Sequence, residues 1–348
     1  MAEQPNVNDA QAIHIIQTTI RQAGEDLRRR YPLLEHQDAI GLGIFCSAVA
    51  ATLLAAWAYL SGAISAWVCI PVVAIATSLL HELEHDLIHW QYFKKNKPIH
   101  HFMLLVGWIL RPGTINPWVR RKLHFLHHKT SGTEADMEER GIGNGQPYGL
   151  LRFWTMADTL GANLYRAARQ APKGKRLKSM GRILMANFPF SVLTLLITYG
   201  YLGFHLIDGA GKLMGAPVEW SFSTLGWESR VSDWMVVLIA PFYLRSFCLN
   251  FISSNMHYYG NVHSLIQQTQ VLNAWYFMPF QLFCFNFGST HGIHHFVVGE
   301  PFYIRQLTAA KAHAVMRAQG VSFNDLRTFS RANRYAPTAA APYRVMGT

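Results

Sequence analysis

Long runs of apolar residues alternate with polar segments along this chain of 348 residues. Four runs are almost free of charge, and they cover residues 40–60, 61–80, 181–207 and 234–252. The third carries only Arg182 near its start, and the fourth continues past Arg245. A helix needs about 20 apolar residues to cross a bilayer. The pattern therefore predicts an all-α, polytopic membrane protein with four transmembrane helices in two hairpins.

Less regular segments flank these runs. Residues 9–30 place Ile13, Ile16 and Ile20 among polar positions, which predicts an amphipathic helix at the membrane surface. Residues 271–287 are apolar too, but polar residues and a proline interrupt them, so we expect an interfacial or re-entrant segment rather than a fifth span. The expected organisation is an N-terminal amphipathic segment (1–37), a catalytic membrane domain (38–300) and a C-terminal tail (301–348), whose Ala- and Pro-rich part (338–342) is expected to be loose.

The distribution of Lys and Arg predicts the orientation. The N-terminal segment has four, residues 91–182 have 17 and the tail after residue 300 has seven. The first turn, about 61–65, has none, and the loop 208–230 has two. Within that loop, residues 209–229 are expected to form a short external cap. Because positive charges stay on the cytoplasmic side, both termini and the central segment are expected in the cytoplasm, with the protein integral to a bacterial inner membrane.

Composition agrees with a membrane protein. Charged residues make up 15% of the chain and hydrophobic residues 50%, whereas an ordinary soluble domain has about 25% charged residues. The net charge of +11 follows from the positive-inside bias and anionic lipid, and nothing indicates nucleic-acid binding. The cysteines lie in apolar runs without a C-x-x-C pair and are expected to be free thiols: Cys46, Cys69, Cys248 and Cys284.

Histidines are concentrated in three short stretches. His81, His85 and His89 are spaced by four residues, so on a helix they form one narrow stripe. Two further stretches share the spacing His-x-x-His-His, which also places imidazoles on one helix face. They contribute His124, His127 and His128, and His291, His294 and His295. On the predicted topology all three stretches lie on the cytoplasmic side.

These imidazoles exceed what one metal ion accepts, because structural zinc takes four ligands and catalytic zinc three. Two ions are expected, and ligation by nitrogen without thiolates suits iron, zinc, copper or nickel. A site fed by apolar helices suits a lipid-like substrate with inert C–H bonds, which favours redox iron. Asp136 and Glu138 follow the second stretch; they either accept hydrogen bonds from metal-bound imidazoles or are solvated acids at a helix start.

The sequence resembles the membrane fatty acid desaturase and hydroxylase superfamily, whose histidine boxes are H-x(3,4)-H, H-x(2,3)-H-H and H-x(2)-H-H. The first stretch is similar to two kinds of first box. His81-Glu82-Leu83-Glu84-His85 looks like that of alkane hydroxylases, and His85-Asp86-Leu87-Ile88-His89 like that of desaturases. The segment from Asn255 to Gly260 resembles the element that supplies an additional histidine ligand, here His257.

The resemblance implies two iron ions and O2 as co-substrate. The implied ligands are His124, His127, His128, His257, His291, His294 and His295, with two of His81, His85 and His89. The spacing to His124 favours His85 and His89, with His81 as an extra group. Asp136, Glu138 and Asn255 are expected beside the ligands.

The expected reaction is desaturation of a fatty acyl chain. Hydroxylation of an alkane or fatty acid, or decarboxylation of a free acid to a terminal alkene, stays open. Two other classes compete. His81-Glu82-His85 matches H-E-x-x-H of zinc metalloproteases, and a haem or metal carrier would use axial histidines on facing spans.

Electrons must come from a partner of ferredoxin, rubredoxin or cytochrome b5 type with its reductase. Basic groups that could dock an acidic donor, or simply be solvated, are Arg120, Arg121, Lys122, Lys173, Lys175 and Arg176. The other expected partners are the fatty acyl substrate and membrane lipid.

Overall fold

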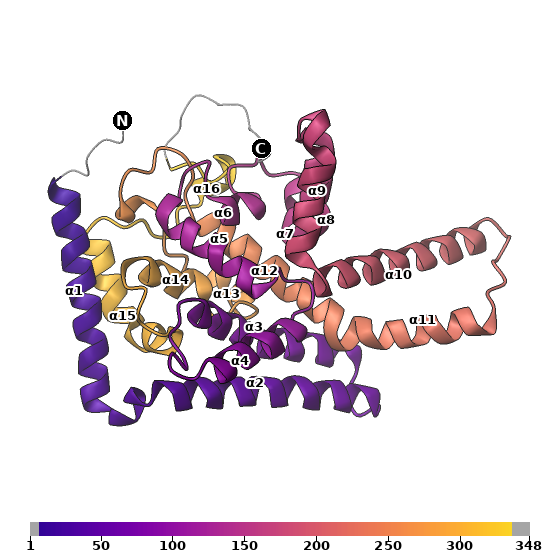
Figure 1. Ribbon diagram of the computed structural model, residues 1–348, viewed down its shortest axis with the longest axis horizontal. Helices are drawn as coiled ribbons and strands as arrows, with labels where there is room; N and C mark the ends of the chain where they lie inside the picture. The colour runs from indigo at the N-terminus through magenta and orange to yellow at the C-terminus, as the bar shows by residue number, and fades with distance from the viewer. Residues whose placement is uncertain (1–6, 336–348) are drawn as a thin grey trace.

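The computed structural model describes residues 7–335, which form helices and loops without a β-strand (Figure 1). The all-α prediction is confirmed. Four helices in this range are long and apolar enough to span a membrane, as the apolar runs predicted. The stretch 338–342, expected to be loose, lies outside the described residues.

The first hairpin consists of α2 (Gln37–Leu60) and α3 (Ala66–Ile88). The apolar run ends at Leu80, but α3 continues for about two more turns through His81 and His85. His89 is its C-cap residue. The two helices lie side by side along one edge of the molecule (Figure 1). The predicted histidine stripe is therefore carried on a rigid extension of a membrane-spanning helix.

The second hairpin differs from its prediction at both ends. α9 (Arg176–Asn187) is a separate helix, and the third span, α10 (Phe190–Leu213), begins only after Pro189, which lacks a backbone N–H and restricts the residue before it. The fourth span runs from Phe222 to Met256 through α11 (Phe222–Trp234), a π-helical turn (Met235–Ile239) and α12 (Ala240–Met256). The cap expected at 209–229 is mostly helical as a result.

Shorter helices outside the spans complete the fold. Residues 150–170 form two helices divided at Asp158, whose Oδ1 accepts a hydrogen bond from the Gly161 N–H and caps the second helix. The helices between the hairpins are α4 (Lys97–Ile109), α5 (Pro117–Thr130), α6 (Met137–Gly141), α7 (Leu150–Ala157) and α8 (Thr159–Gln170). After the fourth span come α13 (Met278–Gln281), α14 (Phe287–Phe296), α15 (Phe302–Ala318) and α16 (Arg327–Ser330).

The apolar segment 271–287 does not form a fifth span. It contains a 3₁₀ turn at Trp275–Phe277 and the single turn of α13, and it leads directly into α14. Trp275 is 82% exposed whereas Phe277 is buried. The segment returns the chain to the third histidine stretch, as expected from its interrupted pattern.

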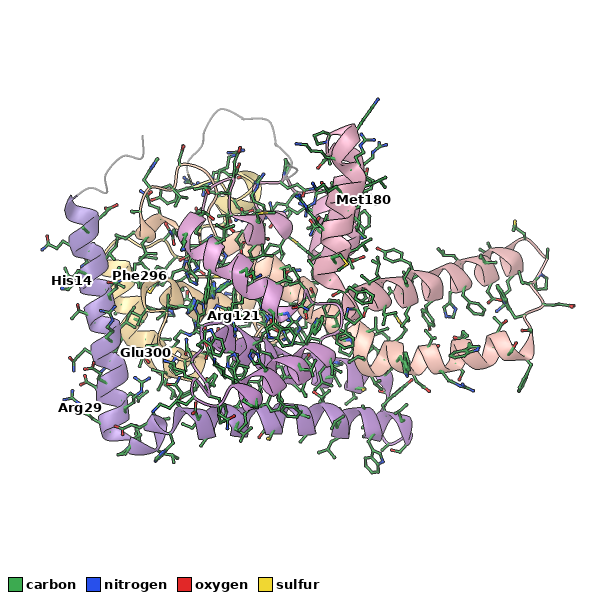
Figure 2. All side chains as sticks on the ribbon, viewed as in Figure 1. His14, Arg29, Arg121, Met180, Phe296 and Glu300 are labelled. Carbon is green, nitrogen blue, oxygen red and sulfur yellow. The ribbon has the colours of Figure 1, made fainter. Side chains whose placement is uncertain are left out.

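The N-terminal helix α1 (Val7–Arg30) packs along α15. Ile16 and Ile20, which we expected at the membrane surface, are fully buried in a cluster with residues of α14 and α15. Gln17 Nε2 donates to the Phe296 carbonyl at 3.1 Å, and Arg28 pairs with Glu300 at 2.6 Å. Figure 2 shows Phe296 and Glu300 beside α1. The apolar face of α1 is therefore covered by protein.

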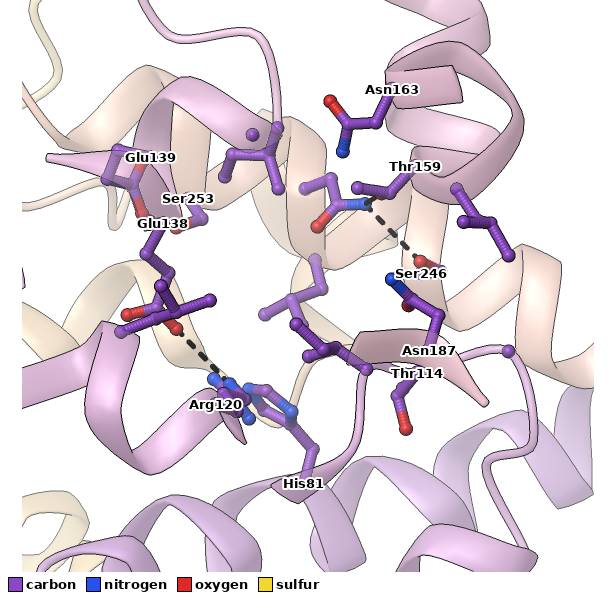
Figure 3. A pocket seen from close by; sticks show the side chains of 18 of the residues that line it. His81, Thr114, Arg120, Glu138, Glu139, Thr159, Asn163, Asn187, Ser246 and Ser253 are labelled. Atoms are coloured by element: carbon purple, nitrogen blue, oxygen red, sulfur yellow. Dashed lines mark hydrogen bonds and ion pairs between the residues drawn. The ribbon is translucent and has the colours of Figure 1, made fainter. Parts of the chain in front are cut away.

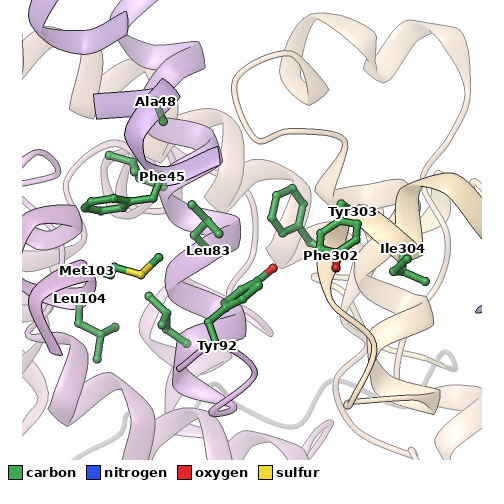
Figure 4. Close-up of a cluster of buried hydrophobic side chains, with 11 residues drawn as sticks. Phe45, Ala48, Leu83, Tyr92, Met103, Leu104, Phe302, Tyr303 and Ile304 are labelled. Atoms are coloured by element: carbon green, nitrogen blue, oxygen red, sulfur yellow. The ribbon is translucent and has the colours of Figure 1, made fainter. Parts of the chain in front are cut away.

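The main apolar core joins the first hairpin to α4 and α15 (Figure 4). Tyr92 lies in its centre, and its hydroxyl donates to Asp86 Oδ2 at 3.1 Å. Its ring passes so close to α2 that a Cβ at Gly41 would lie 2.5 Å from it, so only glycine fits there. This packing fixes α3 against α15 through Leu80, Leu83 and Leu87 of α3.

Candidate metal centre

Four elements bring the predicted histidines to one place. α3 supplies the first stretch, α5 the second and α14 the third, while His257 is the residue at which α12 ends. Asn116 caps α5 by accepting hydrogen bonds from the N–H groups of Trp118 and Val119. The helical spacing then points the imidazoles of each stretch to one side.

Eight imidazoles form two groups of four, which we call site 1 and site 2. Within each group one ring nitrogen of every residue lies within 4.8 Å of the others. Site 1 is formed by His85, His89, His124 and His294, and site 2 by His127, His257, His291 and His295. Each site combines distant segments of the chain.

His128 lies between the two sites. Its Nε2 is 3.1 Å from His124 Nε2 and 3.0 Å from His294 Nε2, both in site 1. Its ring centroid is 5.1 Å from that of His295 in site 2. Nine of the ten predicted histidines therefore lie together, and the chain offers site 1 a fifth imidazole.

Carboxylates hold the outer nitrogens of two imidazoles from α5. His124 Nδ1 donates to Glu138 Oε2 at 2.7 Å, and His127 Nδ1 donates to Asp136 Oδ2 at 2.8 Å. Asp136 also caps α6 through its Oδ1, which fixes the carboxylate in turn. Such bonds set the tautomer and the ring orientation of a ligand histidine, so Nε2 of both rings is left facing the other imidazoles.

Three further residues hold site 2 and were not predicted from the sequence. His257 Nδ1 donates to the Ser253 carbonyl at 2.9 Å and lies 3.3 Å from Glu139 Oε1. Gln268 Oε1 accepts from His295 Nδ1 at 3.2 Å. Glu139 adjoins the acidic pair that the sequence suggested, whereas nothing in the sequence marks Ser253 or Gln268.

Two predicted site residues lie elsewhere. His81 belongs to neither site, and its Nδ1 lies 3.5 Å from the guanidinium of Arg111. Asn255 accepts a hydrogen bond from the Tyr148 hydroxyl at 2.6 Å and donates to the Phe251 carbonyl. Its side chain supports the end of α12 rather than an imidazole.

Buried ion pairs alternate with the histidines of α3. Glu84 pairs with Arg111 and, at 2.7 Å, with Arg120, whose Nε is 3.2 Å from Glu138. Asp86 pairs with Arg305 of α15 at 3.0 Å. Charge pairing offsets the cost of burying the carboxylates of Glu84 and Asp86.

The basic groups predicted to dock a redox partner divide into two kinds. Arg120 is engaged in the ion pairs just described, and Arg121 stacks on Trp90 at 4.3 Å while donating to the Leu87 and Ile88 carbonyls. By contrast, Lys122, Lys173 and Lys175 are exposed. Arg176 is half-buried and donates to the Ala171 carbonyl at 3.1 Å. Of the six predicted groups, the three lysines alone present their charge fully at the surface.

Burial keeps most of these imidazoles neutral, which is the form that binds metal. It lowers the pKa of His89 to about 2 and that of His257 to about 3, helped by neighbouring imidazoles. The pKa values of His291, His294 and His295 are lowered well below the usual value for the same reason. Burial also disfavours the charged form of His127, but the charge and hydrogen bond of Asp136 outweigh it and raise its pKa to about 9. A proton and a metal ion therefore compete for His127.

The arrangement fits metal ions. Both ring nitrogens of His85, Nε2 of His89 and Nδ1 of His294 are buried without a hydrogen-bond partner, which is unfavourable unless another group binds there. The donor set consists of imidazole nitrogens with no thiolate, which suits iron, zinc, copper or nickel.

A cavity of about 210 Å³ adjoins the sites. Figure 3 shows Glu138 and Glu139 on one side of it, His81 and Arg120 at its base, and Thr159, Ser246 and Asn187 opposite the carboxylates. Because Glu138 holds His124 of site 1 and Glu139 adjoins His257 of site 2, one wall of the cavity is shared with both sites.

Comparison with known proteins agrees with this geometry. No curated protein matches the chain. The sequence model of the fatty acid desaturase family matches residues 61–327. That range contains every histidine of both sites and the carboxylates that hold them. The chain belongs to the fatty acid desaturase family.

Proposed function

We propose that this protein is a membrane-bound, di-iron oxidoreductase that uses O2 to desaturate a fatty acyl chain. The observation that carries the proposal is the pair of four-imidazole sites in a member of this family. Bound iron would supply the oxidising power, with O2 and two external electrons, to break an inert C–H bond. We expect both termini and the two sites to lie on the cytoplasmic face, because the Lys and Arg residues are concentrated there.

The residues of the chain hold and isolate the centre. Seven imidazoles of the two sites are buried, and His89 is only partly exposed, so water has little access. Asp136 and Glu138 orient His127 and His124, and their negative charge increases the ligand strength of both rings. We assign the ligand roles to the eight histidines of sites 1 and 2 and to His128, with His81 outside the set.

Hydroxylation and decarboxylation use the same centre and differ in which C–H bond lies next to it. Product analysis separates the three reactions. Membranes that contain the protein are supplied with fatty acids, a reductase system and 18O2. A new internal double bond supports desaturation, a labelled hydroxyl supports hydroxylation, and an alkene one carbon shorter supports decarboxylation. Purified active protein with no iron would refute the proposal.

The geometry disfavours a zinc protease. A protease of the H-E-x-x-H type needs both histidines on one zinc and the Glu free as a base. His81 and His85 do not share a site, and a buried Glu82 faces Arg305 at 3.6 Å. Metal content decides between the two classes, because two irons per chain support the oxidase and one zinc the protease.

Electron delivery requires an acidic protein partner of ferredoxin, rubredoxin or cytochrome b5 type. Exposed lysines lie just beyond the first stretch, at Lys94, Lys95 and Lys97, and on α5 at Lys122 and Lys129. Complementary charge of this kind accelerates encounter and is sensitive to salt. We expect turnover with a reduced acidic donor to fall as ionic strength rises.

A further inference from the structure

α12 carries one charged residue within its apolar run, and that residue is buried. Arg245 is 1% exposed, and its Nε and Nη1 have no hydrogen-bond partner. Its guanidinium lies 5.9 Å from the ring of Phe242, and no ion pair to it is found within residues 7–335. An unpaired cation in a membrane-spanning helix is strongly disfavoured, so such a residue usually serves a binding function.

None of the carboxylates of Glu84, Glu138 and Glu139 pairs with Arg245. Glu139, on the wall of the same cavity, lies 3.3 Å from His257 Nδ1 and accepts a hydrogen bond from the Ser253 hydroxyl at 3.0 Å. Glu84 is shared by Arg111 and Arg120. Glu138 is bound by Arg120 and by His124. Metal ions in sites 1 and 2 would add further positive charge. The described part of the chain therefore provides no anion to pair with Arg245.

Arg245 lines the cavity beside the metal centre. The cavity also has neutral hydrogen-bonding groups and apolar walls, a combination typical of sites that bind small organic ligands. Its volume of about 210 Å³ is well above the roughly 10–15 Å³ that holds one water. The neutral hydrogen-bonding groups include Thr114, Asn163, Asn187, Ser246 and Asn250, and the apolar wall includes Leu123, Leu249 and Phe287.

We propose that Arg245 binds the carboxylate of a free fatty acid whose head group occupies this cavity. The proposal rests on the proposed function and names its substrate class. A guanidinium donates two parallel hydrogen bonds to the oxygens of a carboxylate, and it can do the same to a phosphate. A single-chain monoanion balances the one unpaired charge, whereas a phospholipid would bring two chains to a cavity of only about 210 Å³.

The position of Arg245 has a consequence for the reaction. Glu138 and Glu139 form another wall of the same cavity and hold imidazoles of sites 1 and 2. A carboxylate bound to Arg245 is thus held at a fixed place relative to the metal centre. The oxidised carbon is then expected at a fixed number of carbons from the carboxyl group, whatever the length of the fatty acid.

Binding is tested without turnover, by thermal unfolding of the purified full-length protein in detergent. Wild type is expected to be stabilised by a saturated fatty acid and not by its methyl ester, because ligand binding raises the melting temperature. In Arg245→Met the acid concentration for half-maximal stabilisation is expected to rise at least about tenfold, since two charge-assisted hydrogen bonds are lost. Arg245→Lys keeps the positive charge but cannot donate two parallel hydrogen bonds to the carboxylate. Its acid concentration for half-maximal stabilisation is therefore expected to lie between those of wild type and Arg245→Met.

Arg111→Met is the matched control. Arg111 is equally buried but is paired with Glu84. Its replacement is expected to lower the melting temperature without ligand, whereas Arg245→Met is expected to leave it unchanged or raise it, because an unpaired buried charge is removed. Arg111→Met should keep the wild-type response to the fatty acid.

Three results would overturn the proposal: a wild-type acid response in Arg245→Met, stabilisation by phosphatidylglycerol but not by the acid, or product positions that are constant from the methyl end. Each is separate from a failure of the proposed function. Iron-loaded protein that binds the acid through Arg245 but forms no oxidised product would refute the oxidase alone.

Discussion

Sites 1 and 2 have the same number of imidazoles but different surroundings. In site 2, three of four histidines have their second nitrogen held, by Asp136, by the Ser253 carbonyl and by Gln268. In site 1 only His124 is held in this way, by Glu138. His85 and His294 each have a buried Nδ1 without a partner, and His89 is partly exposed. Site 2 is therefore preorganised by the fold, whereas site 1 depends more on the metal itself.

The largest effect is expected from removing one imidazole of either site. His127→Ala in site 2 and His294→Ala in site 1 should both abolish turnover, because the reaction needs both ions. Metal analysis of the purified variants should show close to one ion per chain in each. Normal turnover in either variant would contradict the two-site assignment.

The carboxylates provide the next test, because they act on one site each. Asp136→Asn should weaken metal binding at site 2 and Glu138→Gln at site 1, each by about 10–100-fold. The amides keep the size of the side chain but lose the charge. Metal titration followed by spectroscopy of the two sites should show the loss confined to one site, and equal loss at both would show that the sites are not independent.

Graded chelation compares the sites directly. Site 1 is expected to lose its metal first in wild type, because fewer of its rings are held and His89 is partly exposed. A form with one metal, at site 2, should accumulate and be inactive. In Asp136→Asn the chelator concentrations that remove the metal from site 1 and from site 2 should be closer together. Simultaneous release of both metals from wild type would show that the different surroundings of the two sites do not affect metal binding.

The smallest effect is expected at His81, the one predicted histidine that neither belongs to a site nor lies between the two sites. His81→Asn should retain two metals per chain, as measured by elemental analysis. Turnover should fall less than in Glu138→Gln, since only a contact with Arg111 and part of the cavity wall change. Loss of one metal would place His81 among the ligands.

The local features of the fold could be read from the sequence with good accuracy. Uncharged runs identified the four spans, and the spacing of His85 and His89 placed them on one face of α3. Asp136 and Glu138 could be suggested because carboxylates so often hold ligand imidazoles. Spans three and four were misplaced because apolar composition does not show where Pro189 separates two helices or how far α11 extends.

Arg245 carried a signal that was seen but given no meaning. It is the single charge in the run 234–252, and a charge there needs a partner. Many such residues pair with an acid of a neighbouring helix, as Arg111 does with Glu84. Only the contacts of the folded chain distinguish an arginine that has its anion from one that does not.

The sequence by itself determined the elements and the chemistry: four apolar helices, three stretches of imidazoles at helical spacing, and a nitrogen donor set suited to two metal ions. It did so because helix geometry relates residues a few positions apart. Tertiary structure alone decided how eight histidines divide into two sites, that His128 lies between the sites and His81 apart from them, and that Arg120 is engaged in ion pairs. Those outcomes depend on contacts between α3, α5, α12 and α14, which are far apart in the sequence and have no periodicity that links them.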